Sequence, residues 1–200
     1  MSTKLTITIP TWLDKFCVWP AMVYRKQKYG YSFRRIYLGE GLWTILDQED
    51  YYRYGSFKWS FMGNRGKIYA VRGIRIGKEK ITILPLHREI MKPPKRRIVD
   101  HKNGDSLDNR RANLRLATRA QNSYNCRKRK NTTSKYIGVS FDKPTKDWAV
   151  QIKHKGKHIW IGRFKSEVEA ARAYDKVAKK YRGEFARLNF PEENYSKITP

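Results

Sequence analysis

The chain has 200 residues, with 44 Lys and Arg against 18 Asp and Glu, which gives a formal charge of +26 at pH 7. Such a positive field favours polyanionic partners. The two cysteines, Cys17 and Cys126, lie far apart and form no CxxC pair, which excludes a disulfide framework or zinc knuckle and suits a reducing compartment. No stretch reaches the roughly 18 apolar residues of a membrane span, and the N-terminus lacks a signal-peptide pattern, so we expect a soluble cytoplasmic protein.

Residues 1–35 form an N-terminal extension of unclear role that is rich in aromatic residues and arginine. Pro10 and Pro20 are expected to interrupt any long helix. Trp12, Phe16 and Val23 share one face at helical spacing, which predicts a segment that docks on the core. A basic amphipathic segment on a membrane surface is the alternative.

Residues 36–130 are expected to form one domain. Alternation around Tyr69 and Val71, with turns at 63–66 and 77–78, predicts a small antiparallel sheet. The following stretch, 92–130, holds 13 basic and three acidic residues, so we expect it to meet phosphates. A solvated face or a localisation signal is the alternative for a basic run.

The segment Asp100–Asn125, which reads DHKNGDSLDNRRANLRLATRAQNSYN, combines an acid, an imidazole and two downstream asparagines. A divalent cation that handles phosphate prefers hard oxygen ligands, which Asp and Asn supply, and His is a base near neutral pH. Local signals predict a strand that ends at Val99, a turn at Gly104, a polar loop through Asn109 and a helix that begins near Thr118. This arrangement folds Asn122 back toward Asp100.

This segment resembles the HNH (ββα-metal) nucleases, in the homing-endonuclease branch where Asp replaces the first ligand His and Asn replaces the last. The resemblance implies that Asp100 and Asn122 hold one Mg2+ or similar ion and that His101 is the general base. It also implies that Asn113 is structural, with its amide bonded to backbone. Asp, Asn and Gly clusters are also ordinary turn chemistry. His87 is expected to be a structural histidine, with a phosphate contact as the alternative.

After a short linker at 131–134, residues 135–191 change character. YIGVSF, WAVQIK and HIWIGRF are three alternating strands, and a helix follows with a capping box at Ser166 and Glu169 and a stop at Gly183. Apolar and polar residues alternate along the second and third strands, so one face of these strands is expected to pack on the core and the other to be available for binding. The core set is Trp148, Val150, Ile152, Ile159 and Ile161, and the opposite set is Gln151, Lys153, His158 and Trp160.

Residues 135–191 closely resemble the AP2/ERF DNA-binding domain, in the YxGV start, the WAxxI and WIGxF strands, the EAARAYD helix and the terminal LNFP. In that family the sheet enters the major groove. Ile137, Ser140 and Asp142 stand where plant members commonly place arginines, so the plant target sequence does not transfer. Residues 192–200 form a tail.

We therefore predict an α+β chain: a small antiparallel sheet with an HNH motif, then a three-stranded sheet with one helix. The predicted function is metal-dependent cleavage of double-stranded DNA by an intracellular, nucleoid-associated protein, typical of phage or mobile-element genes. No membrane contact is expected and no protein partner is inferable. The alternatives are a DNA-binding regulator with a vestigial nuclease fold and an RNA-binding protein. The residues expected to contact DNA are Gln151, Lys153, His158, Trp160, Arg110, Arg111, Arg115, Arg119, Arg127, Lys128 and Arg129.

Overall fold

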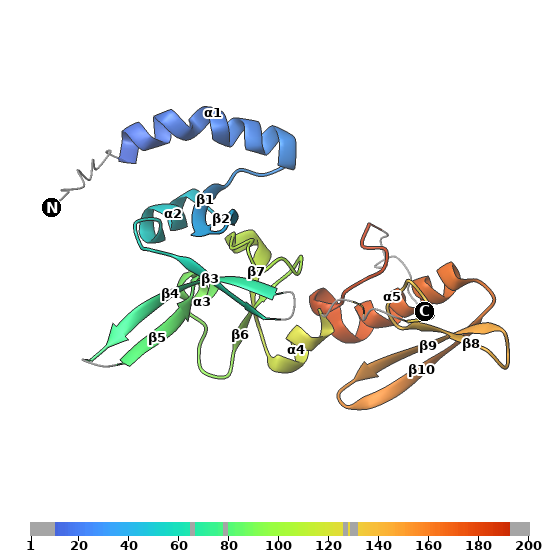
Figure 1. Ribbon diagram of the computed structural model, residues 1–200. Helices are drawn as coiled ribbons and strands as arrows, with labels where there is room; N and C mark the ends of the chain where they lie inside the picture. Colours follow the sequence, from blue (N-terminus) through green and yellow to red (C-terminus); the bar gives the residue numbers. More distant parts are fainter. Residues whose placement is uncertain (1–10, 65–66, 78–79, 126–127, 129–131, 193–200) are drawn as a thin grey trace. The chain divides into compact units, whose positions relative to one another are not determined.

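The computed structural model describes residues 11–64, 67–77, 80–125, 128 and 132–192 and shows the predicted α+β class (Figure 1). The chain divides into two compact units. Unit 1 comprises residues 1–94 and 105–115, and unit 2 comprises residues 95–104 and 116–200. This division differs from the segments expected from sequence, because parts of the basic motif belong to each unit. Arg127, Arg129, part of the linker and most of the tail lie outside the described residues.

Unit 1 begins with helix α1, Thr11–Tyr29, which continues through Pro20. The expectation that Pro20 interrupts a long helix is therefore wrong. A proline inside a helix removes only its own N–H donor, although its ring strains the preceding turn. Pro20 and Trp19 are exposed, so the carbonyl that loses this donor has access to water. Pro10 lies outside the described residues.

Polar contacts, rather than an apolar face, hold α1. Phe16 is 78% exposed, so its predicted docking is wrong, and the side chain of Trp12 lies outside the described part. Arg34 pairs with Asp14 at 2.7 Å, and Arg25 donates to the carbonyl of Phe33 at 2.5 Å. The hydrogen bond from Arg34 lowers the pKa of Asp14, and partial burial opposes it. The spacing of apolar residues in the sequence does not predict such ion pairs and hydrogen bonds, because it takes only apolar positions into account.

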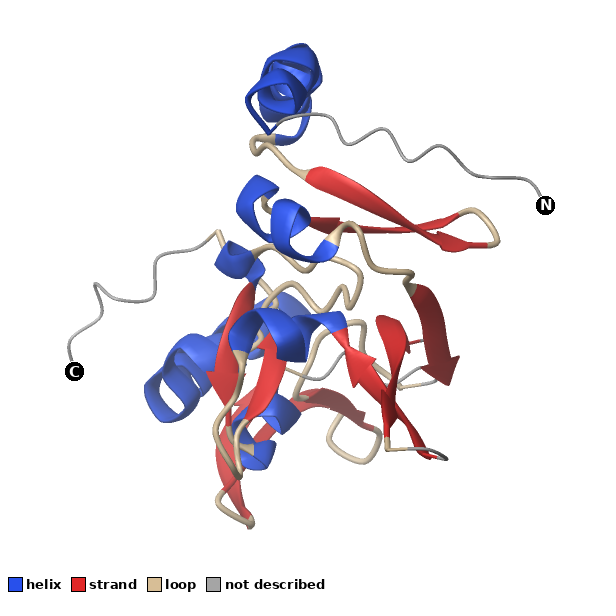
Figure 2. Ribbon diagram, turned by 90° about the vertical axis from the view of Figure 1, so that its left-hand side faces the viewer, coloured by secondary structure: helices blue, strands red, loops and turns tan. Residues whose placement is uncertain are grey.

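The strands of unit 1 form small antiparallel sheets (Figure 2). The predicted sheet before the motif is confirmed, with order β3-β4-β5, and an unpredicted hairpin β1-β2 precedes it. The two predicted turns at 63–66 and 77–78 lie partly outside the described residues. The elements are β1 (Arg34–Gly39), β2 (Leu42–Leu46), α2 (Gln48–Tyr54), β3 (Ser60–Asn64), β4 (Lys67–Ile76), β5 (Lys80–Pro85) and α3 (Leu86–Met91). The buried side chains of unit 1 include Phe33, Ile36, Leu38, Leu46, Trp59, Val71, Leu86 and Ile90.

The motif itself forms short elements. Strands β6 (Ile98–His101) and β7 (Leu114–Ala117) make a two-stranded sheet, and a 3-10 turn, η1, spans Arg111–Asn113. The strand expected to end at Val99 extends through His101, because it pairs with β7. Helix α4 (Arg119–Tyr124) begins where expected, after Thr118, with a capping box that Gln121 completes.

The second half of unit 2 is the predicted three-stranded sheet with one helix (Figure 1). The order β10-β9-β8 comes from antiparallel pairs, and α5 packs on the sheet. The Ser166 hydroxyl accepts from the Glu169 amide at 3.4 Å, and among the described residues only this half of the predicted capping box is found. The elements are β8 (Val139–Asp142), β9 (Asp147–His154), β10 (Lys157–Phe164), α5 (Glu167–Arg182) and the 3-10 turn η2 (Gly183–Phe185).

The predicted faces of this sheet are confirmed. Val150 and Ile152 are buried against α5, with Trp148, Ile159 and Ile161 packed around them. The opposite face carries the exposed set Gln151, Lys153, His158 and Trp160.

A buried carboxylate on α5 holds the segment that follows η2. Asp175 accepts from the backbone amides of Asn189 and Phe190 at 2.8–2.9 Å, and the Asn189 side chain bonds both backbone groups of Ile137. This network ties the final LNF segment to α5 and to the start of the domain. No helix in the part of the chain that the structure describes is long and apolar enough to cross a membrane.

We predict that Gly138→Ala destabilises unit 2 more than Gly156→Ala. Both glycines have positive φ, +76° and +81°, so both substitutions strain the backbone. A Cβ on Gly138 overlaps the ring of buried Tyr174, whereas nothing lies within 4 Å of one on Gly156. Overpacking adds about 1–3 kcal/mol, which urea denaturation of the two variants measures as a difference. Equal stability of the two variants would contradict this packing.

Candidate functional site

Strand β6 carries the acid and the imidazole of the motif at its end. Asp100 is 5% exposed and His101 is 6% exposed. Both side chains are therefore largely shielded from water, and both depend on neighbouring groups for their polar contacts.

Asn125, at the end of α4, supplies such contacts. Its side-chain nitrogen Nδ2 lies 3.0 and 3.2 Å from the two carboxylate oxygens of Asp100 and 2.8 Å from the carbonyl oxygen of His101. It also lies 3.3 Å from the carbonyl oxygen of Lys102. Asn125 was not among the predicted site residues. Its only trace in the sequence is a second asparagine three positions after Asn122, in QNSYN.

Asn122 lies one helical turn before Asn125 on α4. Residues three apart share a helix face, so Asn122 lies on the side that turns toward β6. The side chain that reaches Asp100 is nevertheless that of Asn125, and among the described residues the side-chain amide of Asn122 makes no hydrogen bond. The side-chain oxygen of Asn122 therefore lies near this site but takes no part in the hydrogen bonds that Asn125 makes.

These donors fit a hard cation that keeps most of its water. A carboxylate has about four lone-pair positions, so the Asn125 amide leaves Asp100 with capacity for a metal. Mg2+ commonly binds proteins through one or two carboxylates together with substrate phosphates. Within the described ranges no group of three or more His, Cys, Asp or Glu side chains gathers as a metal cage. The residues thus suit a cation shared with a phosphate.

Helix α4 also rests on the three-stranded half of unit 2. The Tyr124 ring stacks on His154 at 6.0 Å between centroids, and the guanidinium of Arg182 lies 4.6 Å from the Tyr124 centroid. Arg187 donates to the carbonyl oxygen of Asn125 at 3.5 Å. The residue that reaches Asp100 thus also contacts the AP2-like part, through Arg187.

Asn113, in unit 1, makes the backbone contact that a structural residue would make. Its buried side-chain amide donates to the carbonyl of Asp108 at 2.8 Å, and its backbone amide donates to the carbonyl of Arg110 at 2.9 Å. These bonds fix the turn that leads into β7.

The loop before this turn is built onto β2. The Ile45 amide donates to the Leu107 carbonyl at 2.9 Å, and the Asn109 amide donates to the Ile45 carbonyl at 2.8 Å. The Thr44 hydroxyl also donates to Leu107, and the fully buried Asn109 side chain donates to Thr44 at 2.7 Å. A segment more than sixty residues earlier thus supplies the loop with its hydrogen-bond partners.

Two arginines predicted to contact DNA have partners inside unit 1. Arg110 pairs with Asp108 at 2.6 Å, and its guanidinium lies 3.2 Å from the centroid of the Tyr31 ring. Arg111 makes two 2.7 Å bonds with the fully buried carboxylate of Asp50. The hydrogen bond to Asp50 raises the pKa of Arg111. Both arginines therefore stabilise the fold through ion pairs within unit 1, whether or not they also contact a phosphate.

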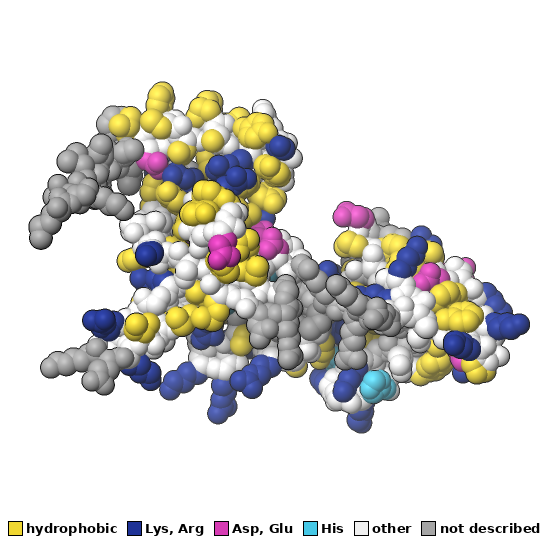
Figure 3. Space-filling view, in the orientation of Figure 1, with side chains coloured by type: hydrophobic (Ala, Val, Ile, Leu, Met, Phe, Trp, Pro, Cys, Tyr) yellow, Lys and Arg dark blue, Asp and Glu magenta, His cyan; other side chains and the backbone are white. Residues whose placement is uncertain are grey.

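The remaining basic candidates differ in setting. Arg119 is exposed at the start of α4, Arg115 is half-buried, and Lys128 bonds Thr132. His87, on α3, packs on the Tyr69 ring at 5.4 Å. Lys and Arg side chains clearly outnumber acidic ones on the face drawn in Figure 3.

The exposed face of β9 and β10 brings its four predicted residues together. Gln151 stands opposite Trp160 in the register, and Lys153 stands opposite His158. Trp160 is 53% exposed, and the Arg163 guanidinium lies 5.1 Å from its ring centroid. The sequence analysis did not single out Arg163.

Arg163 accounts for one of the departures from the plant pattern. It pairs with Asp142 at 3.1 Å across the sheet. Ile137, another departure, packs against the apolar core instead of facing a ligand.

We predict that Arg111→Ala destabilises the protein by about 3 kcal/mol, because it leaves the buried Asp50 carboxylate without its cation. The matched control is Arg163→Ala, which breaks an exposed pair and should cost about 1 kcal/mol or less. Urea denaturation of the full chain measures both. Similar losses for the two variants would show that Asp50 does not depend on Arg111.

Comparison with known proteins agrees with both halves of this description. Residues 92–124 match the family described as HNH endonuclease, and residues 134–184 match the AP2 domain. No solved structure matches the chain.

Curated plant proteins are similar to part of this chain. Dehydration-responsive element-binding protein 2A of Arabidopsis thaliana is 43% identical over 54 residues, which are 26% of this chain and 16% of that protein. APETALA2-like protein 2 of Oryza sativa subsp. japonica is 41% identical over 63 residues, 32% of this chain and 14% of that protein. The chain thus spans about one sixth of the length of these relatives. Both resemblances found in the sequence are confirmed: this chain joins a segment similar to HNH endonucleases to a segment similar to AP2 domains.

Proposed function

We propose that the protein is a metal-dependent endonuclease of the homing type that hydrolyses phosphodiester bonds in duplex DNA and uses its AP2 module for site recognition. One observation carries the proposal. The carboxylate of Asp100 and the backbone of His101 are fixed by a single amide from α4, in a chain of charge +26. A protein that merely bound DNA would have no need to hold the Asp100 carboxylate and the backbone of His101 in this way.

Asp100 and Asn122 would hold the cation, because they offer a carboxylate and an amide oxygen from β6 and α4. When bound, Mg2+ would stabilise charge on the scissile phosphate and on the leaving 3′ oxygen. This matches the preference of Mg2+ for oxygen ligands and retained water.

His101 would take the proton from the attacking water on an imidazole nitrogen. Asn125 holds the backbone of His101 through its carbonyl, and the imidazole would be the group that acts. Hydrolysis in this direction leaves a 5′-phosphate and a 3′-hydroxyl. Asn113 would act only on the loop, through the carbonyl of Asp108.

The AP2 module would add grip and sequence preference. Two modules on one duplex raise each other's effective concentration, so neither needs high affinity alone. The exposed pairs Gln151–Trp160 and Lys153–His158 offer hydrogen-bond donors, a cation and an aromatic ring on one flat face.

The alternative is a DNA-binding regulator whose nuclease fold is a scaffold. It is favoured by the similarity to Ethylene-responsive transcription factor ERN1 of Medicago truncatula, which is 32% identical over 87 residues, 42% of this chain and 32% of that protein. Cleavage assays separate the two functions directly.

We predict that His101→Ala lowers the rate at which supercoiled plasmid is cut by about 10² to 10⁴, while DNA affinity stays nearly unchanged, because a general base acts on the transition state. Asp100→Ala should be as severe, through loss of the cation, and removal of Mg2+ should stop cleavage of the unmodified protein. Asn125→Ala should lower the rate less, and Ser123→Ala, an exposed change on the same helix, should leave it intact. Absence of Mg2+-dependent cleavage would leave the regulator as the function.

We predict that Lys153→Ala and Trp160→Ala blur sequence preference, because these side chains face outward from the sheet. Lys179→Ala, an exposed charge change on α5, is the matched control. Selection from random duplexes with each full-length variant measures sequence preference. A salt titration measures the number of phosphate contacts, because each contact changes the slope of log affinity against log salt concentration by about one. Unchanged preference in both sheet variants would move recognition elsewhere in the chain.

A further inference from the structure

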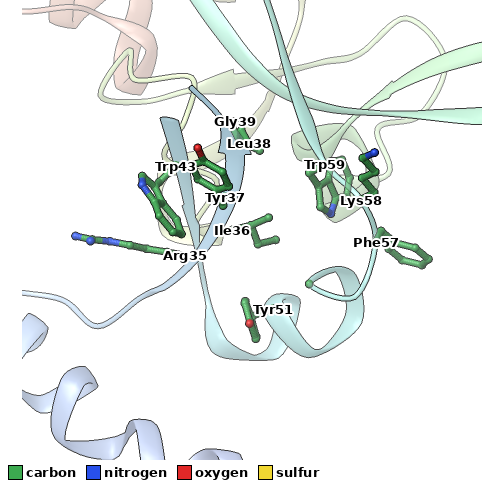
Figure 4. A pocket seen from close by; sticks show the side chains of 11 residues that line it. Arg35, Ile36, Tyr37, Leu38, Gly39, Trp43, Tyr51, Phe57, Lys58 and Trp59 are labelled. Atoms are coloured by element: carbon green, nitrogen blue, oxygen red, sulfur yellow. The ribbon is translucent and has the colours of Figure 1, made fainter. Parts of the chain in front are cut away.

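Unit 1 has an open cavity of about 550 Å³ between the β1-β2 hairpin and the segment that follows α2 (Figure 4). Its size falls within the roughly 300–1,000 Å³ usual for small-ligand sites. The residues that line it are Arg35, Ile36, Tyr37, Leu38, Gly39, Trp43, Tyr51, Gly55, Phe57, Lys58 and Trp59. None of them is a motif residue, so the cavity is separate from the site above.

The composition of the lining selects a class of ligand. Five of its residues are aromatic, two are cationic, and none of those described is acidic. Aromatic faces attract flat rings, and cations attract anions. A nucleotide carries both a flat ring and an anion, so it suits this lining.

Tyr37 and Trp43 are the two most exposed aromatic residues of this lining. They stand opposite each other on β1 and β2, with ring centroids 4.8 Å apart and planes at 49°. Their exposed fractions are 52% and 48%, unusually high for neighbouring large aromatics. The pair therefore offers ring surface to a ligand as well as to each other.

The deeper wall is fixed by contacts of its own. Trp59 is buried and donates from Nε1 to the carbonyl of Tyr54 at 2.8 Å. Arg34 lies 3.9 Å from the Tyr51 ring centroid, and Arg72 lies 4.0 Å from that of Phe57. These arginines already occupy two of the five rings, which leaves Tyr37 and Trp43 for a base.

One exposed cation lies on a strand of this ring pair and the other lies across the cavity. Arg35 is on the same face of β1 as Tyr37, two positions before it, and Lys58 is on the opposite wall (Figure 4). Both are exposed, so a phosphate reaches them without losing its own water entirely.

We propose that this cavity binds an unpaired nucleotide of DNA, with its base stacked on Tyr37 and Trp43 and its phosphate near Arg35 and Lys58. Base-paired nucleotides keep both ring faces stacked inside the duplex, so the site accepts only single-stranded or extruded ones. Stacking tolerates any base, because every base has an aromatic face. The choice of DNA rests on the proposed function, whereas the preference for an unpaired nucleotide rests on the cavity alone.

The test uses the full-length protein and a short single-stranded DNA that carries one 2-aminopurine, whose fluorescence falls when it stacks on an aromatic ring. A paired duplex of the same sequence and a duplex with one bulged 2-aminopurine complete the set. Tyr37→Ala and Trp43→Ala should each weaken single-strand binding by roughly 5- to 150-fold and reduce the quenching. Affinity for the paired duplex should not change.

Controls separate stacking from folding. Trp43→Phe keeps an aromatic ring and should restore most of the binding, and Ile81→Ala removes an exposed apolar side chain of β5 and should change nothing. Thermal melting verifies that each variant is folded. Equal losses on paired and unpaired DNA, or no loss on either, would overturn the proposal, and quenching on the bulged duplex alone would identify an extruded nucleotide as the ligand.

Different results would contradict the proposed nuclease function and the proposed nucleotide site. A protein that never cuts plasmid but loses single-strand binding in Tyr37→Ala and Trp43→Ala keeps the nucleotide site and loses the nuclease function. A protein that cuts plasmid with Mg2+ but binds unpaired DNA equally well in both variants keeps the nuclease function and loses the nucleotide site.

Discussion

The loop between β6 and β7 must satisfy its backbone polar groups, and most of unit 1 is arranged around that need. A loop without regular structure leaves N–H and C=O groups that are costly to bury unpaired. Strand β2 meets this demand through Ile45, which bonds both Leu107 and Asn109, and Thr44 adds a side-chain bond on the same edge. Asp47 extends the contact by accepting from the Arg111 amide at 2.7 Å. The hairpin β1-β2 is therefore a partner of the motif, and its other face is free to form the aromatic cavity.

The motif depends on two separate supports, one in each unit. Asn113 and the β2 contacts shape the loop in unit 1, while Asn125 holds the end of β6 in unit 2. Tyr124 and Arg187 tie α4 to the AP2-like part, and Asn125 joins the end of α4 to Asp100, so these contacts lie within one unit.

The large positive charge is not equivalent to an equal number of phosphate contacts. Arg34, Arg72, Arg110 and Arg111 each pair with a carboxylate inside unit 1 and lie close to its aromatic rings or buried acids. Such arginines hold the small sheets together, which is valuable in a unit with few large apolar side chains per strand. The cations that remain exposed, such as Arg119 and Lys153, are the ones available to a polyanion. Charge counting alone does not distinguish these two populations.

Local pattern determined most of the AP2-like half, because alternation along β9 and β10 and the 3.6-residue spacing of α5 depend only on neighbours in sequence. The same holds for the start of α4, where the capping bonds lie within one turn. Only the tertiary structure brought Asn125 to Asp100, joined β2 to the loop at Asn109, and placed Tyr37 and Trp43 around a cavity. These contacts join residues far apart in the chain or groups whose partner depends on a helix orientation, so periodicity carries no information about them. Pro20 is the opposite case. The local rule that proline interrupts a helix predicts a break, but α1 continues through Pro20 where this part of the helix is exposed to water.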